Sequence, residues 1–203
     1  MRKNLVIILL TVILTGVAVN KAFAAIYTFT PSPADLYDLD HYKYYTWGVN
    51  WLLPANQQIV SATLSIKNIN NWTVEQDILY IHLLDSATLG VTTFEDNQGG
   101  GDNFASWPGD DILLDTFTDL NDYPGPAENY VYNFTADQLA TLKNYSLNDG
   151  RIGFGFDPDC HYWNDGVKFK IVTREAVVPE PATSLLFVSG MMGALGLRRR
   201  KLA

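Results

Sequence analysis

One acidic segment of the sequence, running from Asp157 to Gly166, holds the residue types with the clearest chemistry. It reads Asp-Pro-Asp-Cys-His-Tyr-Trp-Asn-Asp-Gly and joins two stretches of alternating apolar residues. Its carboxylate and amide oxygens are hard ligands of the kind that Ca²⁺ prefers. The predicted calcium ligands are Asp157, Asp159, Asn164 and Asp165. The alternative is a turn-rich loop whose Asp and Asn side chains bond their own backbone.

The spacing within this segment excludes an EF-hand, because Tyr162 stands at the position where that loop needs glycine. A second acidic segment, from Glu95 to Asn103, contains three consecutive glycines and offers further oxygen ligands. The alternative for this second segment is a solvated, mobile loop. Calcium is therefore the one cofactor that the sequence suggests.

The same loop contains Cys160 and His161, which raises the question of a nucleophile or a zinc site. Adjacent residues on an extended loop point apart, whereas a nucleophile needs a base aimed at it. We therefore interpret Cys160 as a buried or half-buried thiol, with an intermolecular disulfide as the alternative. The sequence has no Gly-x-Ser-x-Gly, His-Glu-x-x-His or phosphate-loop motif. It predicts a protein that is not an enzyme.

Aromatic residues are a second candidate for binding, because exposed aromatic rings hold pyranose rings by apolar contact. Trp47 and Trp51 alternate with polar residues and are predicted to lie in the core. The predicted ligand-binding residues are Tyr42, Tyr44, Trp72, Trp107 and Trp163. Their ligand would be an extracellular polysaccharide.

Short strands must position these loops. Strict period-two alternation over residues 59–67 places Val60, Ala62, Leu64 and Ile66 on one face, with polar residues on the other. Further strands are predicted over residues 45–51, 78–84, 112–117, 130–134, 152–156 and 167–171. One short helix is predicted from Ala136 to about Asn144, because Thr135 and Gln138 have the spacing of a capping box.

About seven strands with acidic, glycine-bearing loops indicate an all-β fold, an antiparallel β-sandwich with jelly-roll-like topology. The helix would cap an end or an edge of the sandwich. No long linker divides the middle of the chain, so residues 25–178 are predicted to form one domain.

Residues 1–24 have the parts of a secretory signal peptide. Two basic residues precede an apolar run, and Ala22 and Ala24 give the small-x-small pattern that signal peptidase cleaves. The run is shorter than the ~20 residues of a spanning helix, which favours cleavage over an uncleaved anchor. The sequence therefore predicts an exported protein.

The opposite end, residues 179–203, has a different set of parts. Pro179, Glu180 and Pro181 precede a short apolar stretch, which is followed by three arginines and a lysine. This order resembles the PEP-CTERM sorting signals that exosortase-type membrane enzymes recognise. The resemblance implies that these three residues are the recognition element and that a short transmembrane helix anchors the protein transiently. It implies a destination at the cell surface or in the extracellular matrix.

The net charge of the exported part limits the classes of partner that we expect. The whole chain has a net charge of −8, but residues 25–178 hold seven basic and 21 acidic residues, hence −14. This charge excludes a nucleic-acid partner, attracts cations and disfavours direct adhesion to anionic polymers. The sequence thus predicts an exported, non-catalytic matrix or cell-surface protein that binds polysaccharide, with calcium as a candidate cofactor. The alternative is a secreted hydrolase acting on matrix polysaccharide.

Overall fold

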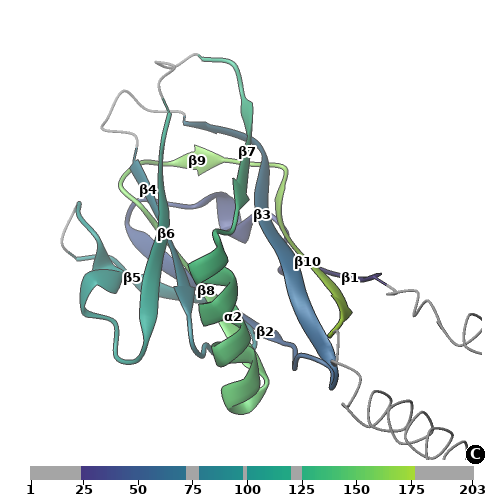
Figure 1. Cartoon of the computed structure of the whole chain (residues 1–203). Helices are drawn as coiled ribbons and strands as arrows, with labels where there is room; N and C mark the ends of the chain where they lie inside the picture. Colours follow the sequence, from purple (N-terminus) through teal and green to yellow (C-terminus); the bar gives the residue numbers. More distant parts are fainter. Residues whose placement is uncertain (1–23, 72–77, 98–99, 120–124, 177–203) are drawn as a thin grey trace, which may run out of the picture.

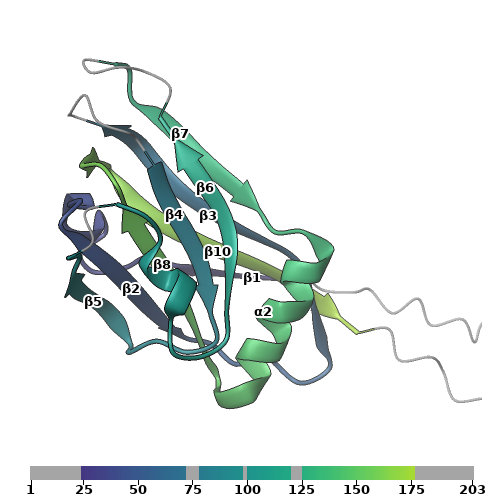
Figure 2. The same ribbon diagram turned by 90° about the vertical axis from the view of Figure 1, so that its left-hand side faces the viewer.

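Two antiparallel β-sheets pack face to face in the computed structural model, which describes residues 24–71, 78–97, 100–119 and 125–176 (Figures 1 and 2). Sheet A has the strand order β1 (Ala24–Phe29), β10 (Gly166–Glu175), β3 (Gln57–Asn71) and β7 (Glu128–Asn133), and β9 (Tyr162–Trp163) also pairs with β3. Sheet B has the order β5 (Gly90–Glu95), β2 (Lys43–Asn50), β8 (Arg151–Pro158), β4 (Ile78–Leu84) and β6 (Asp111–Thr118). The predicted antiparallel, mostly β architecture is confirmed.

The core lies between the two sheets and is built from the alternate residues of each strand. Phe154 on β8 and Phe169 on β10 are both fully buried, and their rings meet edge to face at 4.7 Å across the sandwich. Trp47 and Trp51 are buried as predicted. Alternation therefore identified the inward face of these strands correctly, because a strand with one buried face repeats every second residue.

The prediction for Val60 is wrong. This residue is 36% exposed, whereas Ala62, Leu64 and Ile66 are buried. The pairing of β3 with β10 shifts register at this point, since Val172 pairs with Ser61 and the next residue of β10 pairs with Ile59. Val60 is thus the extra residue of a β-bulge, which re-aims its side chain.

The helix α2 (Ala136–Asp149) contacts β8 of one sheet and β3 of the other, so it packs against both sheets at one side of the sandwich (Figure 1). The predicted capping box of Thr135 and Gln138 is present. The helix runs about one turn further than predicted and ends at Gly150, whose φ of +76° closes it. Its buried face includes Leu142, Tyr145 and Ser146.

Ser146 joins this helix to the chain after β2. Its Oγ donates to the Trp51 carbonyl at 2.9 Å and accepts from the Leu53 amide at 2.8 Å, and the side chain is fully buried. Ser146→Ala is expected to lower the free energy of unfolding by about 1–3 kcal/mol, because it leaves two buried backbone groups without partners. Urea unfolding measures this loss. A control, Asn144→Ala on the exposed side of α2, should change stability by less than about 0.5 kcal/mol, and equal losses would contradict the role of Ser146.

The outward face of sheet B is covered by the chain itself. Two outward positions of β8 are glycines, Gly153 and Gly155. The ring of Phe104, in the short 3₁₀ helix η2 (Asn103–Ser106), lies so close above Gly155 that a Cβ there would stand 2.6 Å from it. A Cβ at Gly153 would stand 2.7 Å from Ala87. The loop between β5 and β6 and the loop between β4 and β5 therefore pack onto this face.

Candidate functional site

The two acidic segments meet at one end of β8. Asp157 is not in a loop, as the sequence suggested, but on the outward face of β8, and it is fully buried beneath the β5–β6 loop. Its carboxylate accepts hydrogen bonds from the Asn103 backbone amide at 2.5 Å and from the Asn103 side-chain amide at 3.3 Å. The Asp159 carboxylate accepts from the Gly101 amide at 3.0 and 3.1 Å. Asp157 and Asp159 thus hold the second acidic loop.

This convergence perturbs the carboxyl groups. The pKa of Asp157 is raised to about 7, mainly because its carboxyl is buried. The hydrogen bonds from Asn103 oppose this shift, and the negative charges of Asp96 and Asp159 add to it. Burial also raises the pKa of Asp159, with smaller contributions from Asp96 and Asp102. The four carboxylates therefore form one electronegative region under the β5–β6 loop.

The other two predicted calcium ligands lie elsewhere. Asn164 is buried, donates to the Asp35 carbonyl at 2.8 Å and accepts from the Gly166 amide at 2.9 Å, so it stabilises a turn. Asp165 is exposed and accepts from Lys67 Nζ at 3.0 Å and from an Asn68 side-chain amide at 2.6 Å. These two hydrogen bonds, led by that of Lys67, lower the pKa of Asp165.

The four predicted ligands are therefore divided between two groups of partners, with Asp157 and Asp159 in one and Asn164 and Asp165 in the other. Among the residues that the structure describes, no group of three or more His, Cys, Asp and Glu side chains is placed so that it could hold a metal ion. Calcium binding stays a prediction, and its candidate residues narrow to Asp157 and Asp159 because these two meet the second acidic loop.

A histidine that the sequence reasoning missed completes this region. His82, on the outward face of β4, is 2% exposed and contacts Asp102 through Nε2 and Asp111 through Nδ1, both at 3.0 Å. Its ring lies 5.1 Å from that of Phe104. The signal for this arrangement was the pair of outward glycines on β8, which leaves room for a side chain from another segment. His82 and Phe104 together fasten the β5–β6 loop to sheet B.

The five predicted ligand-binding aromatics differ in exposure. Tyr42 is 61% exposed and Trp163 is 47% exposed. Tyr44 stacks on Phe94 at 4.9 Å and is half-buried, and Trp107 packs against Phe94 and Phe104 at 5.9 and 5.2 Å. Trp72 lies outside the described residues. Two of the five, Tyr42 and Trp163, thus present a ring to solvent.

Cys160 and His161 are the remaining candidates of the Asp157–Gly166 segment. Cys160 is fully buried, which confirms its interpretation as a buried thiol. His161 contacts Asp40 at 2.9 Å, and its ring lies 4.2 Å from that of His41. The loop before β2 and the loop after β8 therefore meet at one end of the sandwich.

Comparison with known proteins decides the nature of the tail. Residues 177–201 match the PEP-CTERM protein-sorting motif. The tail therefore carries a PEP-CTERM sorting signal, as the resemblance indicated. This motif implies an exported protein that an exosortase processes and that a C-terminal membrane anchor holds.

The PEP-CTERM residues themselves, Pro179, Glu180 and Pro181, lie outside the described residues, as does Ala22 of the predicted signal cleavage site. Ala24 is the first residue of β1 and pairs with Arg174, so cleavage after Ala24 would leave the rest of this strand in the mature protein. None of the helices in the described part of the chain is long and apolar enough to cross a membrane. Signal-peptide cleavage stays a prediction.

No curated protein matches the chain. Solved structures give faint likenesses. A latent aurone synthase (polyphenol oxidase) is 14% identical over 64% of this chain and 24% of its own, with a TM-score of 0.34. Tomato aspermy virus is 8% identical over 88% of this chain and 97% of its own, with a TM-score of 0.32. A structure of the Gx strain of infectious bursal disease virus is 12% identical over 78% of this chain and 33% of its own, with a TM-score of 0.19.

Proposed function

We propose that the exported domain is a non-catalytic protein of the extracellular matrix or cell surface that binds polysaccharide. The observation that carries this proposal is the exposure of Tyr42 and Trp163, at 61% and 47%, on a domain that the sorting motif sends out of the cell. Large aromatic rings open to solvent offer flat apolar faces on which a pyranose ring can lie. The matrix is where such a polymer would be met.

The rival function is a secreted hydrolase, and one observation favours it. Asp157 has the raised pKa of about 7 that suits a general acid, and Asp159 is a second carboxylate close by. Asp157, however, is fully buried beneath the β5–β6 loop and already bonded to Asn103. A glycosidic bond cannot reach it without displacement of that loop, which supports the non-catalytic proposal.

The strand order supports a jelly-roll topology for this domain. Without β5 and β9, the eight remaining strands, numbered along the chain, follow the order 1-8-3-6 in sheet A and 2-7-4-5 in sheet B. Two four-stranded antiparallel sheets connected in this order form a jelly roll, an architecture shared by lectins and capsid proteins. The fold alone does not specify a ligand.

Substitution of the exposed aromatics tests the proposal. Trp163→Ala and Tyr42→Ala are each expected to weaken polysaccharide binding by about tenfold, because one ring contributes roughly 1–1.5 kcal/mol. The measurement is retention of the full chain, purified in non-ionic detergent, on immobilised dextran and polygalacturonate. Leu113→Ala, at a residue that is 49% exposed on β6, is the control and should bind like the original protein.

Two results would overturn the proposal. Release of reducing ends from either polymer, abolished by Asp157→Asn, would establish the hydrolase. Failure of the original protein to bind either dextran or polygalacturonate would contradict polysaccharide binding.

A further inference from the structure

The basic residues of this acidic protein are not spread over its surface. Residues 25–178 carry seven basic and 21 acidic residues. Four of the seven, Lys67, Lys168, Lys170 and Arg174, are exposed on the outward face of sheet A. Residues that alternate along a strand share a face, so the three on β10 point the same way as every second residue of that strand. The net charge of −14 therefore conceals one locally basic face.

The remaining outward positions of sheet A are neutral. Lys168 stands opposite Ser65 on β3, and Lys170 stands opposite Thr63. The neighbouring outward residues are Ile26 and Thr28 on β1, Val172 on β10, Ser61 on β3, and Asn129, Val131 and Asn133 on β7. None of these described positions carries a carboxylate. Asp165 stands directly before β10, and its ion pair at 3.0 Å neutralises Lys67.

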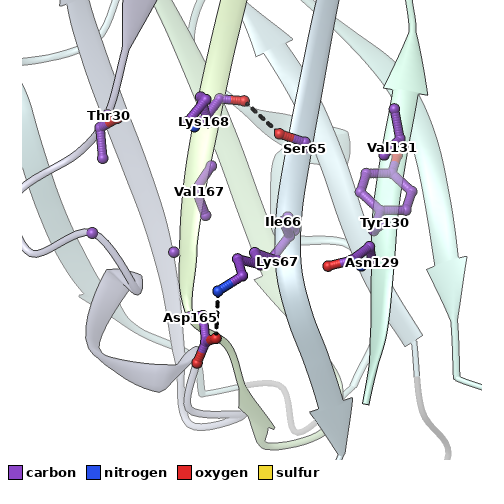
Figure 3. Close-up of a pocket in the computed structure, with 12 residues that line it drawn as sticks. Thr30, Ser65, Ile66, Lys67, Asn129, Tyr130, Val131, Asp165, Val167 and Lys168 are labelled. Atoms are coloured by element: carbon purple, nitrogen blue, oxygen red, sulfur yellow. Dashed lines mark hydrogen bonds and ion pairs between the residues drawn. The ribbon is translucent and has the colours of Figure 1, made fainter.

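A groove runs along this face between β10, β3 and β7 (Figure 3). It has a volume of about 450 Å³. Its lining includes Ser65, Val131 and Lys168, and Figure 3 shows Lys67 reaching Asp165 at its end. Lys168 and Lys170 are two residues apart on one strand, so their attachment points are about 7 Å apart. Lys168 and Lys170 therefore form a line of positive charge beside the groove.

An aromatic ring stands at the end of the same face. Trp163 on β9 pairs with Asn70 on β3, while the adjacent pair, Tyr162 with Asn71, is fully buried. Since cross-strand partners point to one side, Trp163 points outward with Asn70. The exposed ring thus extends the basic face beyond Lys67.

The two outward faces of the sandwich differ in access. Sheet B is covered by Phe104 and by the β4–β5 loop, whereas the outward residues of sheet A, including Lys168 and Lys170, are exposed. At physiological ionic strength charges are screened beyond about 8 Å. A ligand on sheet A therefore meets the local cations more strongly than the distant acidic loops.

We propose that the outward face of sheet A docks an acidic polysaccharide that lies along β10 and β3. Lys168, Lys170 and Arg174 contact its carboxylates or sulfates. The hydroxyl groups of Thr63 and Ser65 donate to Asn133 Oδ1 at 3.0 Å and to the Lys168 carbonyl at 3.4 Å, so each accepts a hydrogen bond from a sugar hydroxyl. Trp163 stacks on a sugar ring at the end of this face. This inference rests on the proposed polysaccharide binding and adds the chemical class of the polymer and the face that holds it.

The composition of the face favours a glycan over other anionic partners. Duplex DNA carries one charge per ~1.7 Å of its axis and is bound by denser clusters of Lys and Arg. Lys168, Lys170 and Arg174, set among hydroxyl and amide groups, match a polymer with a charge on some sugars and hydroxyls on all. The line of cations along one strand also suits an extended chain better than the curved surface of a second copy of this protein.

Charge reversal on this face tests the inference. The face variant is K168E/K170E, and the matched control is K143E/R151E, which makes the same change in net charge at exposed residues away from sheet A. The full chain in non-ionic detergent is titrated with polygalacturonate, dextran sulfate and neutral dextran. We expect the face variant to bind both acidic polymers at least about tenfold more weakly and the control to change by less than about threefold. K168R/K170R, which keeps the charges, should bind like the original protein.

The outcomes separate this inference from the function on which it rests. Binding of neutral dextran that neither charge variant alters would overturn the basic face but leave polysaccharide binding intact. Equal loss in the face variant and the control would show that net charge, and not this face, decides. Tighter binding to duplex DNA, or a dimer that the face variant abolishes, would replace the glycan with another occupant. Binding to none of the polymers would overturn both proposals.

Discussion

Phe104→Ala is expected to lower the free energy of unfolding by about 3–5 kcal/mol, the range for removal of a fully buried phenylalanine. The ring of Phe104 is completely buried above Gly155, beside His82 and Trp107. Its loss leaves a cavity on sheet B and removes the main apolar anchor of the β5–β6 loop. Chemical unfolding measures the global loss. Faster hydrogen exchange at the Gly101 and Asn103 amides, which bond Asp159 and Asp157, would show release of the loop.

Gly155→Ala provides the matched test of this packing. A Cβ at residue 155 would stand 2.6–2.8 Å from ring atoms of Phe104, so the two cannot coexist without displacement. We expect Gly155→Ala to destabilise the original protein strongly and to cost much less in the Phe104→Ala background. Additive losses in this double-mutant cycle would contradict the contact between the ring and β8. A loss below about 1 kcal/mol for Phe104→Ala would contradict the anchoring role.

Asp157→Asn is expected to stabilise the protein at pH 8 and to remove most of its pH dependence between pH 5 and 8. The carboxyl pKa is about 7 in the folded protein and about 3.9 in an unfolded chain. Between these values the folded protein binds the extra proton, so stability falls as the pH rises. A shift of this size corresponds to at most about 4 kcal/mol, and we expect about half of it. An asparagine keeps an acceptor for the Asn103 amide and has no charge to bury.

Thermal unfolding as a function of pH measures this effect. The control is Asp165→Asn, because Asp165 is exposed and its pKa is lowered by Lys67. The contribution of Asp165 is present above its unfolded pKa and is lost as the pH falls through the folded value, so its removal should leave the slope between pH 5 and 8 intact. A wild-type protein whose stability rises over that interval would contradict the assignment to Asp157.

The same titration tests calcium. A cation bound by Asp157 and Asp159 requires the ionised carboxylates, so calcium should stabilise the original protein at pH 8 and leave Asp157→Asn unchanged. Equal unfolding temperatures with calcium and with chelator would remove calcium from the proposed function. The Asp157→Asn stabilisation would then report only the cost of burying an unneutralised carboxylate.

Three strands of the structure were not predicted from the sequence, and each of them pairs with a single neighbour. They are β1 and β5, which lie at sheet edges, and the two-residue strand β9, which pairs with β3; none of the six residues of β5 is buried. An edge strand buries less surface, so its apolar pattern is weak. The central strands β8 and β10 bury the alternating apolar residues Ile152, Phe154, Phe156, Val167, Phe169 and Ile171, and their alternation was correctly interpreted.

The sequence by itself determined the features that depend on neighbouring residues. The alternation of β10, the capping box of Thr135 and Gln138, and the PEP-CTERM motif at residues 177–201 all lie within short stretches. Only the tertiary structure decided that Asp157 meets Asn103 rather than Asp165, that Phe104 covers Gly155, and that the basic residues gather on one face. These contacts join residues far apart in the chain, and strand pairing and loop packing bring them together. Such pairing is set by which faces bury together in the whole domain, which no local pattern of residues encodes.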